Sequence, residues 1–177
     1  MYNYPFIRLI RAYISSLFSE KVTVKDKTTI SMRCSIGDID PYWEMNNGRY
    51  QQLADIGRFD HGFRTGFFKK ALKNKISFTV VGTATKYRYR IPFGKKFTMT
   101  TKVIYVDEKW TYYYHEFIYN GRITSTILAR TGMVKNGKLV RSKEASKIFN
   151  LNIPKVELPL WVADWIKSDE SNPAFVK

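Results

Sequence analysis

The 177-residue chain has one cysteine, no long apolar run and none of several common cofactor or metal motifs. Its single cysteine, Cys34, excludes an internal disulfide and is typical of a reducing compartment, so we expect a cytoplasmic protein. No apolar run is long enough to span a membrane. The sequence also has no P-loop, no Rossmann glycine pattern, no G-x-S-x-G elbow and no Cys/His zinc spacing, and His61 and His115 stand alone. We therefore expect no metal and no resident cofactor.

Acidic residues are scarce as well. The chain has 15 Asp and Glu against 30 Lys and Arg, which gives a formal net charge of +15. Such a chain attracts anionic partners, namely nucleic acid, acidic lipid or phosphate-bearing molecules such as coenzyme A, and composition leaves all three open. Hydrophobic residues make up 44% of the chain, enough for one domain with a real core. We place this domain at residues 22–169, after an N-terminal helix within 1–21 and before a frayed tail at 170–177.

Residues 5–18, PFIRLIRAYISSLF, have the spacing of an amphipathic helix. Arg8, Arg11, Ser15 and Ser16 share the polar side. The opposite side is apolar and carries Phe6, Leu9, Ile10, Tyr13, Ile14, Leu17 and Phe18. Two interpretations stay open: the helix docks on the domain or on a partner subunit, or it makes a peripheral contact with a membrane surface.

Most of the remaining chain alternates polar and apolar residues, as strands do. A first run lies within residues 22–36, and four more follow at 77–91, 96–107, 109–120 and 122–134. Short turns join the last four, among them a strong two-residue hairpin signal at Asn120-Gly121, so they form an antiparallel meander. The chain is therefore predicted to be α+β, with a sheet of about five strands and further C-terminal helices within 142–149 and 158–167.

The stretch 38–64, DIDPYWEMNNGRYQQLADIGRFDHGFR, combines carboxylates with the start of a long helix. Asp38 and Asp40 lie in a loop, and a helix over 47–65 begins directly after it, with Asn46 or Asn47 suited to cap it. Tyr50, Leu53 and Ala54 have helical spacing, and Gly66 is suited to end the helix. Free N–H groups at a helix N-terminus can hold an oxyanion, while a nearby carboxylate acts as base or nucleophile. This stretch is the predicted site of chemistry, and its helix is the one that the sheet is predicted to wrap.

The segment DIDPYWEMNNGRY resembles the signature of hotdog-fold thioesterases of the 4-hydroxybenzoyl-CoA thioesterase-like superfamily. The longer MNNGRYQQLADIGRFDHGFRTG is especially similar to the branch that includes the thioesterase superfamily member 6-like proteins, and the resemblance covers about residues 30–165. It implies a hotdog fold and a homodimer or dimer of dimers with active sites at the subunit interface. It also implies hydrolysis of an acyl-CoA or acyl-carrier-protein thioester in lipid metabolism, with coenzyme A present only as part of the substrate.

The resemblance assigns the catalytic carboxylate to Asp40. Glu44 stands where many relatives carry a histidine, and Asp55 stands where related thioesterases often have an acidic residue on the central helix, so both are predicted to assist catalysis. Residues at the helix start are predicted to bind substrate or hold the oxyanion: Asn46, Asn47, Gly48 and Tyr50.

Basic residues near residue 90 are candidates for the coenzyme A phosphates. Arg88 and Arg90 alternate with tyrosines on one predicted strand, and Lys95 and Lys96 lie in the turn that follows. A solvated or charge-paired face is the alternative interpretation of these cations.

Two other functions stay open. The segment Tyr42-Trp43-Glu44 favours a non-catalytic protein that binds acyl thioesters or lipid, because it lacks the histidine common in relatives. The net charge and the interleaved Tyr/Arg strand favour a nucleic-acid-binding module, but no recognised binding motif supports it, and we expect no nucleic-acid partner.

Overall fold

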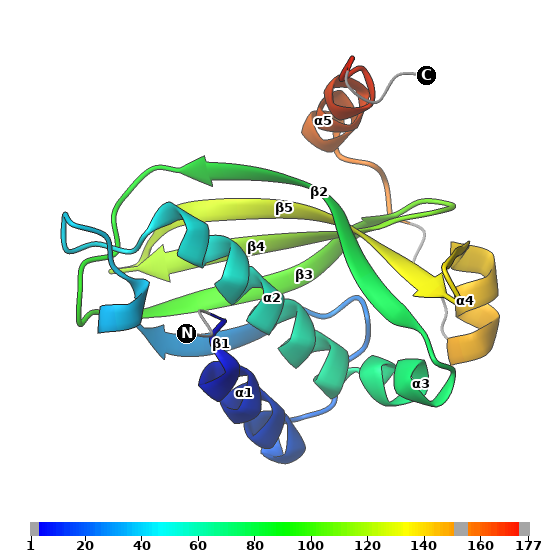
Figure 1. The fold of residues 1–177 in the computed structure, drawn as a ribbon, viewed down its shortest axis with the longest axis horizontal. Helices are drawn as coiled ribbons and strands as arrows, with labels where there is room; N and C mark the ends of the chain where they lie inside the picture. The colour runs from blue at the N-terminus through cyan, green and yellow to red at the C-terminus, as the bar shows by residue number, and fades with distance from the viewer. Residues whose placement is uncertain (1–3, 151–155, 174–177) are drawn as a thin grey trace.

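A curled antiparallel sheet organises the chain (Figure 1). The computed structural model describes residues 4–150 and 156–173. The strands run in the order β1-β3-β4-β5-β2, and β6 pairs with β5. Their bounds are β1 Thr28–Arg33, β2 Ser77–Tyr87, β3 Lys96–Val106, β4 Thr111–Tyr119, β5 Arg122–Lys135 and β6 Lys138–Val140. The helices are α1 Phe6–Phe18, the short 3₁₀ turn η1 Ile36–Asp38, α2 Asn47–Arg64, α3 Phe67–Lys73, α4 Ser142–Phe149 and α5 Leu160–Glu170.

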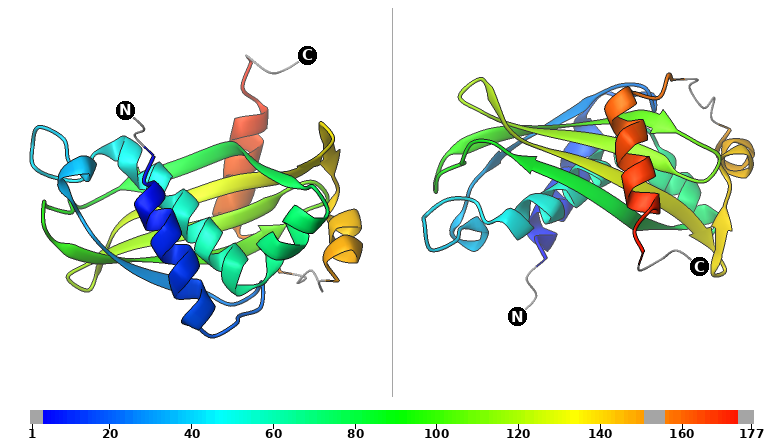
Figure 2. Two further views of the ribbon diagram at one scale, coloured as in Figure 1. Left: turned by 60° about the horizontal axis from the view of Figure 1, so that its bottom comes forward. Right: turned by 90° about the horizontal axis from the view of Figure 1, so that it is seen from above.

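Helix α2 lies across the concave face of the sheet, the arrangement that the resemblance implied (Figures 1 and 2). The Asn46 side chain caps its start by accepting a hydrogen bond from the Gly48 amide at 2.9 Å. After α2 ends, Gly66 adopts a φ of +70°, as predicted for the stop. Gly57 lets the helix approach β3, because an added Cβ would clash with Thr101 Oγ1 and lie 2.7 Å from Met99 Cε.

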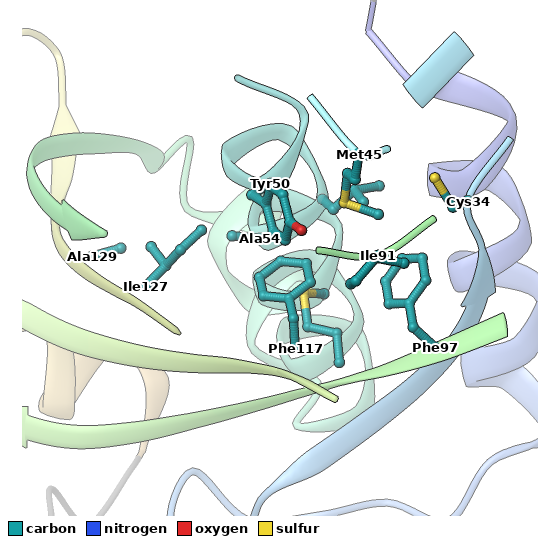
Figure 3. Close-up of a cluster of buried hydrophobic side chains, with 11 residues drawn as sticks. Cys34, Met45, Tyr50, Ala54, Ile91, Phe97, Phe117, Ile127 and Ala129 are labelled. Atoms are coloured by element: carbon teal, nitrogen blue, oxygen red, sulfur yellow. The ribbon is translucent and has the colours of Figure 1, made fainter. Parts of the chain in front are cut away.

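The main core lies between α2 and the sheet (Figure 3). Tyr50, Leu53 and Ala54 follow helical spacing and all face the sheet. The ring of Tyr50 meets that of Phe117 edge-on, with centroids 4.9 Å apart. Cys34 is fully buried in this core, and burial raises its pKa to about 11, so it is a packing residue rather than a nucleophile.

Helix α5 covers the opposite face of the sheet (Figure 2). Val162 packs there with Tyr112 and Leu128. This confirms a C-terminal helix that packs on the domain. The helix extends to Glu170, one residue into the segment 170–177 that was predicted to be frayed, and residues 174–177 of that segment lie outside the described residues.

The sheet has six strands rather than about five. The additional strand, β6, follows a tight turn in which Asn136 and Gly137 have φ values of +50° and +74°. With only three residues it is too short to show an alternating pattern. The first predicted strand is also shorter, because Asp26 accepts hydrogen bonds from the backbone and side chain of Thr23 and closes a turn before β1.

Helix α1 docks on the domain along the border between its predicted polar and apolar sides, which corrects the docking of the apolar side that its spacing suggests. Ala12 and Ser16 are buried, and Arg8 reaches the loop after β1. Most of the apolar side faces outward instead. Small side chains at Ala12 and Ser16 permit this close approach, whereas the larger apolar residues would hold the helix farther away.

Candidate active site

The loop between η1 and α2 carries Asp40 on a tight turn. The Asp40 backbone N–H donates to Glu44 O at 2.9 Å, and its carbonyl accepts from the Trp43 N–H at 3.1 Å. Its side-chain Oδ1 accepts a further hydrogen bond from the Tyr42 amide at 2.9 Å. Trp43 completes the turn with a φ of +60°. The Asp40 carboxylate is partly exposed, so it is both oriented by the loop and accessible to substrate.

Asp38 has a different role from Asp40, although the sequence presents the two as a pair. Its side chain is 3% exposed and accepts hydrogen bonds from the backbone and hydroxyl of Ser35, both at 2.7 Å. It also forms ion pairs with Arg8 and with Arg49, whose Nε lies 3.2 Å from Oδ1. Asp38 therefore ties α1, the loop and the first turn of α2 together, and its bonds leave it unsuited to attack a substrate.

The start of α2 supplies the predicted oxyanion groups, and its hydrogen bonds distinguish among them. The Asn46 amide donates to Asp38 O at 2.8 Å, and the Gly48 amide donates to the Asn46 side chain. Within residues 4–150 and 156–173, the Asn47 N–H has no such acceptor. Asn47 is exposed and lies at the positive end of the helix dipole. The amide free to hold an oxyanion is thus that of Asn47.

A hollow of about 190 Å³ lies beside this helix start. Glu44 and Arg90 flank it, with the Arg90 Nη1 3.8 Å from the Glu44 Oε2. The lining brings several predicted residues together: Glu44, Asn47, Tyr50, Arg88 and Arg90. Tyr50 contributes mainly to the core, since it is 2% exposed and burial raises its pKa to about 12.

Asp55 is separated from this hollow along α2. Eight residues from Asn47 correspond to about 12 Å of helix. Asp55 lines another cavity, of about 270 Å³, with Tyr113 and with phenylalanines from α2, α3 and β2. It forms an ion pair with Arg58, yet desolvation still raises its pKa. Within a single chain, the structure therefore does not place Asp55 beside Asp40.

The four basic residues predicted to bind phosphate lie in different places. Arg88 and Arg90 lie at the hollow beside the helix start, whereas Lys96 begins β3 and lines a groove between α1 and β1. Lys95 is exposed in the preceding turn, where its carbonyl accepts from the Cys34 amide at 2.9 Å. Of the four, Arg88 and Arg90 are the pair that the fold brings to the site.

A sequence model of the family described as "Thioesterase-like superfamily" matches residues 34–166, which include the loop, the hollow and the whole sheet after β1. The chain belongs to the thioesterase-like superfamily.

Curated relatives of this thioesterase-like chain include Protein THEM6 of Danio rerio, which is 32% identical over 105 residues. The match covers 58% of this chain and 52% of the relative. Protein THEM6 of Drosophila melanogaster is 32% identical over 118 residues, which cover 66% of this chain and 61% of the relative. The chain thus spans about half to three-fifths of the length of these relatives.

Solved structures, among them a thioesterase, share the fold. DHNA-CoA thioesterase from Staphylococcus aureus superposes with a TM-score of 0.62 at 17% identity, covering 85% of this chain and 96% of that chain. The protein SAV2348 from Staphylococcus aureus, solved in complex with CoA, gives a TM-score of 0.58 at 19% identity, with coverage of 80% and 94%. This confirms the hotdog architecture that the resemblance implied, with the sheet curled around α2.

Residues 4–150 and 156–173 contain no cluster of three or more His, Cys, Asp or Glu suited to a metal ion. In the same ranges, no helix has both the length and the apolar character needed to cross a membrane.

A buried polar network that the sequence did not predict lies beneath α2. The His115 Nε2 lies 3.0 Å from Arg58 Nη1, and its Nδ1 lies 3.0 Å from Thr101 Oγ1. His115 is fully buried. It contacts Nη1 of Arg58, whereas Nη2 of Arg58 pairs with Asp55. The alternating pattern of β4 could have placed His115 on the inner face, but nothing in the pattern identifies Arg58 as its neighbour.

The burial of His115 predicts a loss of stability in mild acid. Desolvation, followed by the charge of Arg58, lowers the pKa of His115 well below 6.5. The unfolded imidazole takes up its proton near pH 6.5, so this contribution to stability is complete above that pH and is lost as the pH falls below it. The slope is at most about 1.4 kcal/mol per pH unit.

Urea unfolding at a series of pH values, compared with that of His115→Gln, measures this effect. We expect a shallower dependence of the free energy of unfolding on pH in the variant between about pH 6.5 and 5. Because His61 titrates in both proteins, the difference between the two slopes isolates His115. Equal slopes would show that His115 is not held neutral in the folded chain.

Proposed function

We propose that this chain hydrolyses an acyl-CoA or acyl-carrier-protein thioester to a free acid and a free thiol, without a metal. The observation that carries the proposal is a partly exposed carboxylate, Asp40, on the loop that leads into α2, beside the unused Asn47 amide at the helix N-terminus in the chain. Asp40 does not itself line the hollow, but its backbone N–H donates to the carbonyl of Glu44, which lines the hollow together with Asn47. Membership in the thioesterase-like superfamily supports the same chemistry. The structure of a 4-hydroxybenzoyl CoA thioesterase mutant complexed with 4-hydroxybenzoyl CoA shares this fold, with a TM-score of 0.57 at 13% identity.

In this proposal Asp40 either attacks the thioester carbonyl or removes a proton from the attacking water. As the carbonyl carbon becomes tetrahedral, its oxygen gains negative charge, which the Asn47 N–H and the helix dipole stabilise. The carbon–sulfur bond then breaks and the thiolate leaves. Water supplies the hydroxyl group of the acid, either directly or by hydrolysing an acyl-aspartyl intermediate. Glu44 assists at the same hollow.

Arg88 and Arg90 are proposed to bind the phosphates of coenzyme A. Both residues are exposed and line the hollow. The Arg90 side chain is 73% exposed, so it can leave its ion pair with Glu44 and bind a phosphate. A structure of this fold solved in complex with CoA supports CoA as part of the substrate. Lys95 and Lys96 are the less favoured candidates. Lys96 lines the groove between α1 and β1, and Lys95 lies in the turn before β3, so neither lines the hollow.

A homodimer joined along β2 would complete the site. β2 is an edge strand, and Val80 and Val81 are 43% and 39% exposed on it. Thr79 and Val80 also line the cavity that contains Asp55, so a second copy on this edge would close that cavity and could bring its own loop to Asp55. Light scattering should give twice the mass of one chain, and a monomer at micromolar concentration would exclude this arrangement.

The test of the proposed function is release of free thiol from short, long and aromatic acyl-CoAs and from acyl-carrier protein. We expect saturable turnover of at least one class, unchanged by a chelator because no metal takes part. Turnover that a chelator abolishes would overturn the metal-free mechanism.

A second candidate is a non-catalytic protein that binds acyl thioesters. The observation that favours it is Glu44, which stands where many relatives carry a histidine. At the hollow, the Glu44 carboxylate forms an ion pair with Arg90. Tight binding of an acyl-CoA with no thiol release across the panel would establish this function in place of hydrolysis.

A further inference from the structure

The outward side of α1 is an apolar surface that the rest of the described chain leaves uncovered. Five large residues lie on it at helical spacing, with exposures from 49% to 87%: Ile7, Ile10, Ile14, Leu17 and Phe18. Figure 2 shows α1 along the outside of the molecule, beside α2. Monomeric proteins rarely expose so many large apolar side chains together, and such patches mark interaction surfaces.

Several contacts fix α1 in this orientation. Arg8 donates to Asp38 Oδ1 at 3.0 Å and to the Arg33 carbonyl at 2.9 Å. Tyr13 meets Phe63 of α2 edge-on, with centroids 5.2 Å apart. After the helix, the Val22 amide donates to Arg64 O at 3.3 Å, and Arg64 donates to Glu20 O at 3.2 Å. Turning the apolar side inward would break the ion pair of the buried Asp38, so the outward orientation belongs to the fold.

We infer that this side of α1 docks on an anionic lipid surface. α1 contains no acidic residue, and Arg11 is exposed on it. Three exposed lysines, Lys21, Lys25 and Lys27, follow directly in the chain. Residues 4–27 hold five basic and two acidic residues in all. A helix with Ile, Leu and Phe on one side and basic residues beside them lies in the plane of a membrane, with its apolar side at the boundary between headgroups and acyl chains.

The charge favours lipid over a second copy of this chain. Two copies meeting through α1 would bring together two surfaces bordered by exposed basic residues, namely Arg11, Lys21, Lys25 and Lys27 of each copy. An anionic membrane instead attracts those charges before the apolar side chains insert. This docking does not depend on catalysis, so it can hold or fail independently of the proposed function.

Flotation of the full chain with lipid vesicles tests this surface. The vesicles are phosphatidylcholine alone, or phosphatidylcholine with about one-third phosphatidylserine, at low and high salt. The test variant is Ile10→Gln with Ile14→Gln, and the matched control is Leu160→Gln, an exposed leucine on α5. Because these three side chains are exposed, the substitutions should not disturb the fold, and circular dichroism of each variant checks this.

The unmodified chain and Leu160→Gln should float with the anionic vesicles, more weakly at high salt, and much less with phosphatidylcholine alone. The double variant should bind about tenfold more weakly, because two inserted side chains are lost. Failure of the unmodified chain to float, or flotation of the double variant equal to it, would overturn the inference. If the unmodified chain does not float and the double variant loses self-association in light scattering, the surface belongs to a second copy instead.

Discussion

Asp40→Asn should lower kcat/KM for thioester hydrolysis by about 10²- to 10⁴-fold, the range typical of removing a positioned acid, base or nucleophile. The asparagine can keep the hydrogen bond that Asp40 Oδ1 accepts from the Tyr42 amide, so the loop should retain its conformation. What it loses is the negative charge that attacks the carbonyl or activates water. Free-thiol release measures the effect, and thermal unfolding verifies that the folded state is unchanged.

Two further variants make that experiment specific. Asp164→Asn makes the same chemical change at an exposed position on α5 and should leave turnover as it was. Asp55→Asn reports whether the carboxylate in the other cavity is also required. An Asp40→Asn protein with activity within about twofold of the unmodified chain would remove Asp40 from the mechanism. If Asp55→Asn alone abolished turnover, the catalytic carboxylate would lie on the helix.

Asp38→Ala should destabilise the folded chain by about 3–5 kcal/mol, the cost of breaking a buried ion pair by removing one partner. Asp38 is 3% exposed, while the side chains of Arg8 and Arg49 are 17% and 10% exposed. Without the carboxylate, both guanidinium groups lose this ion pair in a position that is largely protected from solvent. Urea unfolding at pH 7 measures the loss.

Asp164→Ala is the matched control and should change the free energy of unfolding little, since Asp164 is exposed. A loss below about 1 kcal/mol in Asp38→Ala would show that the ion pairs of Asp38 contribute no more than surface pairs. The site loop would then be held by its backbone hydrogen bonds alone.

Local patterns predicted most of the fold because the elements are long and regular. Alternation over 9 to 14 residues identified β3, β4 and β5, and the Asn120-Gly121 turn, with φ values of +50° and +70°, fixed their meander. The central helix was predicted from its cap, its apolar spacing and Gly66. Strand β6 was not predicted, because three residues are too few to show an alternating pattern.

The orientation of α1 could not be read from its sequence. Helical spacing shows that two sides differ, but which side meets the domain depends on fit and on distant partners. Here the partner of Arg8 is Asp38, 30 residues away in the chain. The small residues Ala12 and Ser16 then make the closer contact.

The roles within the site depended on tertiary contacts in the same way. Asp38 and Asp40 are the same residue type two positions apart, and the structural carboxylate differs from the accessible one in its bonds to Ser35 and to two arginines. The amides at the helix start look equivalent in sequence, but Asn46 and Gly48 are already hydrogen-bonded. The spacing Ser35-x-x-Asp38, a capping-box pattern, was the local signal that could have identified Asp38 as structural.

The most direct test of the proposed activity is the balance of products when an acyl-CoA is incubated with the unmodified chain. We expect one free thiol and one free acid for each thioester consumed, with many thioesters consumed per protein molecule. Recovery of the acyl-CoA intact from a saturated complex, for every acyl group tried, would contradict hydrolysis and leave a binding protein with a thioesterase-like fold.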